Sequence, residues 1–164
     1  MKKHLLITLL LTTVIANAQC WEKISSGERH SIGIKTDGTL WAWGFNSDIG
    51  LLGNGGTGTE FSPIQIGTVN TWKEVASGTT NSFAIKDDGT LWGWGSNTSG
   101  QLGTGSTTLF SLVPVQVGTS TWKKVETGSG HTVAIKADGT LWAWGNNEKA
   151  TLGDGTFVNK STPT

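Results

Sequence analysis

Short segments of alternating residues run through this chain. In 31–35, two isoleucines alternate with small or polar residues, and in 39–43, Leu40 and Ala42 alternate with two tryptophans. An Asp-Gly pair separates the two segments. An alternation with a period of two over four to eight residues predicts strands rather than helices. Both sides of these segments are largely apolar, so we expect sheets that are covered on both faces by neighbouring elements.

The same pattern is written three times. Trp21, Trp72 and Trp122 are 51 and 50 residues apart, and the Trp-x-Trp pairs that begin at Trp41 and at the two equivalent positions keep this spacing, which uses all nine tryptophans. A fixed period of about 50 residues is typical of stacked repeat architectures. We therefore divide the chain into a leader at 1–18 and repeat units at 19–71, 72–121 and 122–164.

Each unit contains four expected strands. The first begins at the leading tryptophan, and an Asp-Gly pair joins the second and third, which predicts a tight hairpin with a type I′ turn. The fourth begins at Pro63 or Pro114, and in the third unit the sequence stops where this strand should start. This gives about 11 strands. Four-stranded units covered on both faces predict an all-β protein made of three β-propeller blades, the third incomplete.

Charge and composition exclude several classes of function. Lys plus Arg and Asp plus Glu both number 12, so no basic surface for nucleic acid is expected. The run Gly53 to Gly58 matches G-x-G-x-x-G, but no parallel strand and helix surround it, so we interpret it as a loop. His30 and His131 share a repeat position that holds Asn81 in the second unit; this favours hydrogen bonds to the loop backbone over a metal site. We expect no enzyme, cofactor or metal.

The N-terminus has the pattern of a secretory signal peptide. Lys2 and Lys3 precede an apolar run, and Ala16-Asn17-Ala18 supplies small residues for cleavage near Ala18. The run is too short to span a membrane, so we expect a secreted, periplasmic or cell-surface protein. Cys20 is the only cysteine, and the large Gln19 before it disfavours lipidation.

One repeat family has the motifs of this sequence. Gly-x-x-His-Ser/Thr, Asp-Gly-x-Leu-x-x-Trp-Gly-x-Asn and Gly-Gln-Leu-Gly-x-Gly occur in order, mainly in 128–155 and in 100–105. The chain resembles the regulator of chromosome condensation repeat over residues 21–164. The resemblance implies a seven-bladed propeller, of which three blades are a part. Three explanations stay open: a fragment of a longer protein, assembly with itself or a sister repeat chain, and an open arc.

Positions that differ between units are candidates for binding, because scaffold positions repeat while free positions vary. If connections alternate between two rims, the turn after the first strand shares a rim with the long loop after the third. The candidate partner-binding residues are Glu28, Arg29, His30, Phe61, Thr79, Thr80, Asn81, Phe110, Ser129 and His131. Phe45 and Phe157 are further aromatic candidates in these loops.

The function expected from the sequence is a secreted, non-enzymatic protein–protein interaction module whose partner is another protein. Family members implied by the resemblance include exchange factors for a small GTPase and secreted bacterial inhibitors of β-lactamases. A guanine-nucleotide exchange role is therefore one alternative, although no wedge-like insertion is present. A binder of cell-surface carbohydrate or cell wall is the other, and the core-like placement of the tryptophans counts against it.

Overall fold

The computed structural model describes residues 20–106 and 108–164, so the predicted signal peptide at 1–18 lies outside the described part. Within these ranges the chain forms ten strands and no helix, and thus no helix that could cross a membrane. The strands are β1 (Trp21–Ser26), β2 (His30–Lys35), β3 (Leu40–Gly44), β4 (Glu60–Gln65), β5 (Trp72–Ser77), β6 (Asn81–Lys86), β7 (Thr90–Ser96), β8 (Phe110–Thr127), β9 (His131–Lys136) and β10 (Leu141–Gly145).

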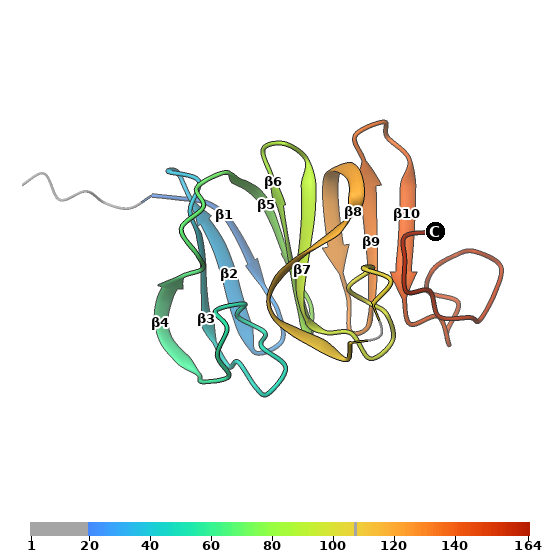
Figure 1. The fold of residues 1–164 in the computed structure, drawn as a ribbon, viewed down its shortest axis with the longest axis horizontal. Helices are drawn as coiled ribbons and strands as arrows, with labels where there is room; N and C mark the ends of the chain where they lie inside the picture. Colours follow the sequence, from blue (N-terminus) through green and yellow to red (C-terminus); the bar gives the residue numbers. More distant parts are fainter. Residues whose placement is uncertain (1–19, 107) are drawn as a thin grey trace, which may run out of the picture.

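The strands form antiparallel sheets that stand side by side along the long axis of the molecule (Figure 1). The first sheet has the order β1-β2-β3-β4, and the second has the order β10-β9-β8-β7-β6-β5. We refer to the stretches 19–71, 72–121 and 122–164 as unit 1, unit 2 and unit 3. The all-β fold and the propeller arrangement predicted from the sequence are confirmed.

The expected strand count is wrong by one, because β8 combines two predicted strands. Its first part pairs with β7, from Ser96↔Phe110 to Thr90↔Thr121, and its second part pairs with β9 from Trp122 onward. The outer strand of unit 2 thus continues into the first strand of unit 3 without a break. In unit 3, Thr164 exchanges two backbone hydrogen bonds of 3.1 Å with Ala143, on the side of β10 where units 1 and 2 have their fourth strand.

The hairpin between the second and third strands differs from the expected type I′ turn. Gly38 has a φ of 79° and Asp37 has no positive φ, and the Gly38 amide donates to the Lys35 carbonyl over 2.8 Å. This geometry is a type I turn closed by a bulge at glycine. Asp37 Oδ1 accepts from the Thr39 amide and hydroxyl at 3.0 and 2.6 Å, so the turn does account for the repeated aspartate.

The core lies between units rather than inside one sheet. Each unit has an indole face, defined by the tryptophans of its first strand and of the end of its third, and a leucine face, defined by one leucine of the third strand and one of the following loop. The indole faces hold Trp21 and Trp43, Trp72 and Trp94, and Trp122 and Trp144. The leucine faces hold Leu40 and Leu52, Leu91 and Leu102, and Leu141 and Leu152. The leucine faces of units 1 and 2 pack against the indole faces of units 2 and 3.

Each junction seats one tryptophan over a glycine. Trp144 Nε1 donates to the Gln101 carbonyl over 2.9 Å, and a Cβ added to Gly103 would lie 2.5 Å from that nitrogen. Gly103 also has a φ of 72°, which side-chain-bearing residues rarely adopt. The glycine therefore serves both the turn and the close approach of the indole ring. The same contact holds Trp94 in the junction between units 1 and 2, with the Leu51 carbonyl as acceptor at 2.9 Å.

Candidate functional site

The turns that follow the first strand of each unit lie next to one another on one rim. A Cβ on Gly78 would overlap the carbonyl oxygen of Gly128, so the turns of units 2 and 3 can approach this closely only through glycine. Thr80 Oγ1 donates to the Ser129 carbonyl over 3.1 Å. The turns 27–30, 78–81 and 128–131 therefore form a continuous row, which we call the turn rim.

The loops that follow the third strands join the same rim. The Phe45 amide donates to the Arg29 carbonyl over 2.9 Å, and the Ser96 amide donates to the Thr80 carbonyl over 2.8 Å. The Asn146 amide makes the equivalent bond in unit 3. The alternation of connections between two rims therefore places turn and loop together, as the sequence predicts.

Two grooves run along the turn rim. The groove between units 1 and 2 has a volume of about 290 Å³, and its lining includes Glu28, Arg29, Phe45, Thr79 and Thr80. The groove between units 2 and 3 has a volume of about 530 Å³. Its lining is Thr80, Ser96, Thr98, Ser99, Gln101, Ser129, Gly130, His131, Asn146 and Thr151. Because Thr80 lines both grooves, the structure brings six of the ten predicted site residues onto one surface.

The two grooves differ in chemistry. In the first, the Arg29 guanidinium carbon lies 5.8 Å from the centre of the Phe45 ring, and Arg29 Nε lies 3.3 Å from a carboxylate oxygen of Glu28. The second is lined by hydroxyl, amide and imidazole groups and by no carboxylate, lysine or arginine side chain. The rim thus offers one charged and aromatic corner followed by a neutral, hydrogen-bonding stretch.

Two predicted contact residues are buried, which corrects their assignment to the rim surface. His30 is 3% exposed and Asn81 is fully buried, because the next unit covers each of them. His30 Nε2 lies 2.7 Å from Ser82 Oγ, and Asn81 Oδ1 accepts from Thr127 Oγ1 over 3.0 Å. Each side chain bonds a side chain of the following unit, not the loop backbone as expected. Burial lowers the pKa of His30 from 6.5 to about 4.

The two predicted phenylalanines lie away from the grooves. Phe61 is 96% exposed on β4, and Phe110 is 44% exposed at the start of β8. Both are on the outer strands, and neither lines a rim groove. Phe45 on the first groove is the aromatic residue that the structure brings to the site.

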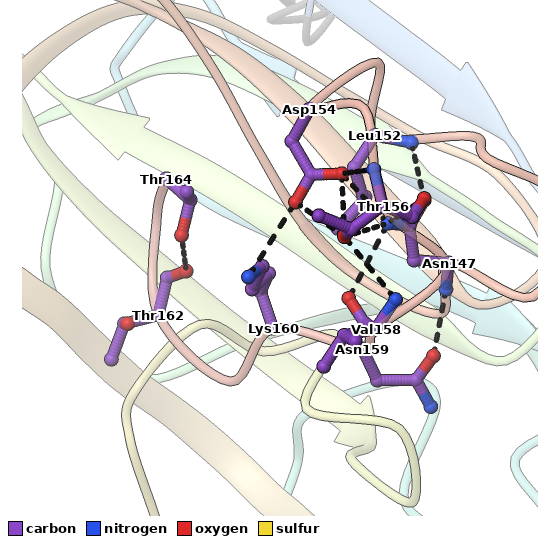
Figure 2. Close-up of polar contacts among 9 residues, drawn as sticks. All are labelled: Asn147, Leu152, Asp154, Thr156, Val158, Asn159, Lys160, Thr162 and Thr164. Carbon is purple, nitrogen blue, oxygen red and sulfur yellow. Dashed lines mark hydrogen bonds and ion pairs between the residues drawn. The ribbon is translucent and has the colours of Figure 1, made fainter.

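A buried asparagine that is not among the predicted site residues holds each loop. Asn46, Asn97 and Asn147 occupy the same repeat position. Asn147 Oδ1 accepts from the Leu152 amide over 3.0 Å, and its Nδ2 donates to the Thr156 and Val158 carbonyls over 3.0 and 3.3 Å (Figure 2). The recurrence of Trp-Gly-x-Asn in all three units is the signal that could have identified it.

A carboxylate completes the loop of unit 3. Asp154 accepts from the Thr156 hydroxyl at 2.8 Å and from its amide at 2.9 Å, and lies 3.5 Å from Lys160 Nζ (Figure 2). The Thr156 side-chain hydrogen bond is the largest of the effects that lower the pKa of Asp154 to about 2. Asp154 is therefore engaged within its own loop. Among the residues the structure describes, no three His, Cys, Asp or Glu side chains converge to hold a metal ion.

Stacked antiparallel units that repeat one junction define a β-propeller, here represented by three units. The sequence matches the regulator of chromosome condensation (RCC1) repeat at residues 37–85, 88–135 and 138–164. A second family model of the RCC1 repeat matches residues 21–48, 72–101 and 122–150. The chain therefore belongs to the RCC1 repeat family, and the resemblance seen in the sequence is confirmed.

Its relatives are longer proteins. The chain is similar to the ultraviolet-B receptor UVR8 of Arabidopsis thaliana, with 33% identity over 87 residues that cover 52% of this chain and 20% of UVR8. It is also 33% identical to the regulator of chromosome condensation of Xenopus laevis over 96 residues, which cover 58% and 22% of the two chains. Prp20p from Saccharomyces cerevisiae has the same fold, with a TM-score of 0.80 and 22% identity over 88% of this chain and 37% of that one. The chain thus spans about a fifth of the length of UVR8 and of the Xenopus laevis protein.

Proposed function

We propose that the chain is a non-enzymatic protein-binding module and that it binds another protein across the turn rim. One observation carries the proposal: the positions that vary between units line one continuous surface, while the positions that build the junctions repeat. The variable pairs are Glu28-Arg29, Thr79-Thr80 and Ser129-Gly130. Repeated positions are explained by folding, so the variable surface is where a specific partner can be distinguished.

The chemistry of the rim supports a protein as the partner. Arginine and aromatic residues are enriched where protein interfaces derive most of their affinity. Arg29 beside Phe45 supplies this combination at one end of the rim. The neutral groove between units 2 and 3 supplies hydroxyl and amide groups that match peptide N–H and C=O groups. A carbohydrate ligand is less well supported, because Phe45 is the one aromatic residue that lines these grooves.

The family gives independent support. The similar protein Prp20p is described with binding properties toward Gsp1p and histones. Since fold alone does not fix a partner, this supports protein binding as a class and names no partner for the present chain. We further propose that the chain is exported and cleaved after Ala18. N-terminal sequencing of secreted protein would then give Gln19 as the first residue, and an intact Met1 on cell-internal protein would contradict export.

A pair of matched substitutions tests the rim. Thr80→Arg places a long charged side chain where the two grooves meet. Thr36→Arg makes the same change in the exposed β2–β3 hairpin on the opposite rim. Both proteins should keep the far-ultraviolet circular dichroism spectrum of the original chain. We expect crosslinking in the source organism to capture the same partner with the original chain and Thr36→Arg, but not with Thr80→Arg.

The purified partner then gives the decisive measurement. Blocking a central position should raise the Kd for Thr80→Arg by about tenfold or more, with Thr36→Arg unchanged. Equal binding by both variants would overturn the rim as the site. Binding lost only in Thr36→Arg would move the site to the opposite rim. Accelerated nucleotide release from a captured small GTPase would instead identify the exchange role.

A further inference from the structure

Among residues 20–106 and 108–164, each of the two surfaces that form a junction between units is left uncovered once. Leu40 and Leu91 are fully buried in the two junctions, whereas the equivalent Leu141 of unit 3 is 69% exposed. At the other end, Trp21 is 39% exposed, while its equivalents in units 2 and 3 are buried. The chain therefore presents a leucine face on unit 3 and an indole face on unit 1, which are the two surfaces that meet inside it.

The leucine face of unit 3 keeps the shape that seats a tryptophan. Gly153 has a φ of 68°, close to the 73° of Gly53 and the 72° of Gly103. A Cβ on Gly53 or Gly103 would lie 2.8 or 2.5 Å from an indole nitrogen, whereas a Cβ on Gly153 would meet nothing within 4 Å. Beside Gly153 is a groove of about 540 Å³ whose lining includes Leu141 and Thr151. Thr151 occupies the repeat position whose carbonyl accepts the indole N–H in the two filled junctions.

The indole face of unit 1 is already arranged as it is inside a junction. The Trp21 and Trp43 ring centres are 5.5 Å apart with an interplanar angle of 57°. The equivalent rings of unit 3, which are packed against unit 2, are 5.6 Å apart with an angle of 58°. Docking therefore requires no rearrangement of the two rings. Ile24 lies on this face and is 75% exposed, whereas the equivalent Val125 is 4% exposed in its junction.

We infer that the leucine face of unit 3 binds the indole face of unit 1 of a second copy of this chain, head to tail. The contact continues the two junctions already present, so Trp43 of the second copy takes the place of Trp94 and Trp144 and donates to the Thr151 carbonyl. Ser31 of that copy occupies the position of Ser82, whose hydroxyl donates to the same acceptor as Trp94. Because the two surfaces differ, the contact is heterologous and produces rings or chains of copies.

One charged position provides a separate test of the register. In the junction of units 1 and 2, Lys23 Nζ lies 3.0 Å from a carboxylate oxygen of Glu74, which occupies the same repeat position. Lys124 is the equivalent in unit 3. Head-to-tail docking therefore brings Lys124 of one copy to Lys23 of the next, where like charges oppose association. Lys124→Glu should consequently tighten the contact by about two- to fivefold at low salt.

The experiment measures self-association of the purified chain by analytical ultracentrifugation across a concentration series. Ile24→Lys and Leu141→Lys each place a lysine on one of the two faces. They should each raise the dissociation constant by about a hundredfold, since an unpaired ammonium would be buried. Both side chains are mostly exposed in the single chain, so the variants should fold. Leu109→Lys, at an exposed leucine of the unit 2 loop, is the matched control and should associate normally.

Mixing the two blocked variants distinguishes head-to-tail binding from other modes. Ile24→Lys retains an intact leucine face and Leu141→Lys retains an intact indole face, so the mixture should form a heterodimer although neither variant associates alone. A chain that stays monomeric at about 100 μM would overturn the inference. Association that survives both substitutions would do so too, and so would a mixture that fails to pair while each variant has the original circular dichroism spectrum.

Discussion

Acid should destabilise this fold through His30, which the junction between units 1 and 2 buries in neutral form. Ser82 Oγ donates its single hydrogen to the Leu51 carbonyl over 2.9 Å, so it accepts from His30 Nε2–H at 2.7 Å. The ring therefore carries its proton on Nε2, and Nδ1 is buried without a hydrogen-bond partner. A second proton on Nδ1 would create a buried cation with no acceptor.

The size of the effect follows from the difference in proton affinity between the folded and unfolded chain. Burial lowers the pKa of His30 from 6.5 to about 4, so the unfolded chain binds more protons between these values. Stability is then constant above pH 6.5, falls as the pH drops toward 4, and levels off below it. At 1.36 kcal/mol per pKa unit, the full loss is about 3 kcal/mol, and about 2 kcal/mol of it is reached at pH 5.

Urea unfolding followed by tryptophan fluorescence at pH 7.5 and pH 5.0 measures this loss. His30→Asn is the matched variant, because unit 2 has Asn81 at this position and the fold accommodates it there. We expect the original chain to lose about 2 kcal/mol more than His30→Asn between the two pH values. An equal loss in both proteins would refute the assignment.

The aspartates do not disturb this assay. Hydrogen bonds from Thr39, and equivalent bonds in units 2 and 3, lower the pKa of Asp37, Asp88 and Asp138 below 3.8. A carboxyl whose pKa is lowered in the folded chain stabilises the fold at any pH above the pKa that it has in the unfolded chain. It loses this contribution only as the pH falls through the two pKa values. Their effect therefore begins only at about pH 5, the lower limit of the assay, and grows below it.

Three further predictions concern the junctions and loops. In urea unfolding of dilute protein, Gly103→Ala should lower the free energy of unfolding by about 3 kcal/mol or more, because the new methyl group would overlap the Trp144 indole. Gly153→Ala has a similar φ but open space around it, so it should cost only about 1–2 kcal/mol. Equal losses would contradict the packing of Trp144 over Gly103. Asn97→Ala should cost about 2–3 kcal/mol in the same assay, because the Leu102 amide and loop carbonyls lose their partner; a loss near zero would refute that role. Iodide should quench only a minor share of the tryptophan fluorescence, since one of the nine indoles, all within the described ranges, is exposed; extensive quenching would contradict the core.

The architecture was predictable because the junction uses the same residue types each time. Trp72 and Trp122 recur at a fixed spacing, and packing against the preceding unit requires an indole at each. The residues that repeat are therefore the residues that make the contacts between units. The turn type was not predictable from Asp-Gly alone, because the same pair suits both a type I′ turn and a bulge at glycine, and only the Lys35 to Thr39 pairing selects between them.

The candidate site was predictable in position but not in detail. Alternating connections place Thr80 and Ser129 on one rim, which follows from strand order alone. The burial of His30 and Asn81 depends on the neighbouring unit, which a local pattern does not contain. The exposure of Phe61 could not be predicted for the same reason. Phe61 lies on β4, and the way in which β4 pairs with β3 decides which of its side chains face solvent.

The continuous strand β8 makes the two links between units mechanically different. Unit 1 is connected to unit 2 by residues 66–71, which lie outside any strand. Units 2 and 3 share one strand that is hydrogen-bonded to β7 along its first part and to β9 along its second. Tension along the chain meets only isolated backbone hydrogen bonds at the first link, such as those from the Ile66 amide to the Leu40 carbonyl and from the Asp87 amide to the Thr71 carbonyl. At the second link it is carried by a ladder of backbone hydrogen bonds, so these two units bear load as one body.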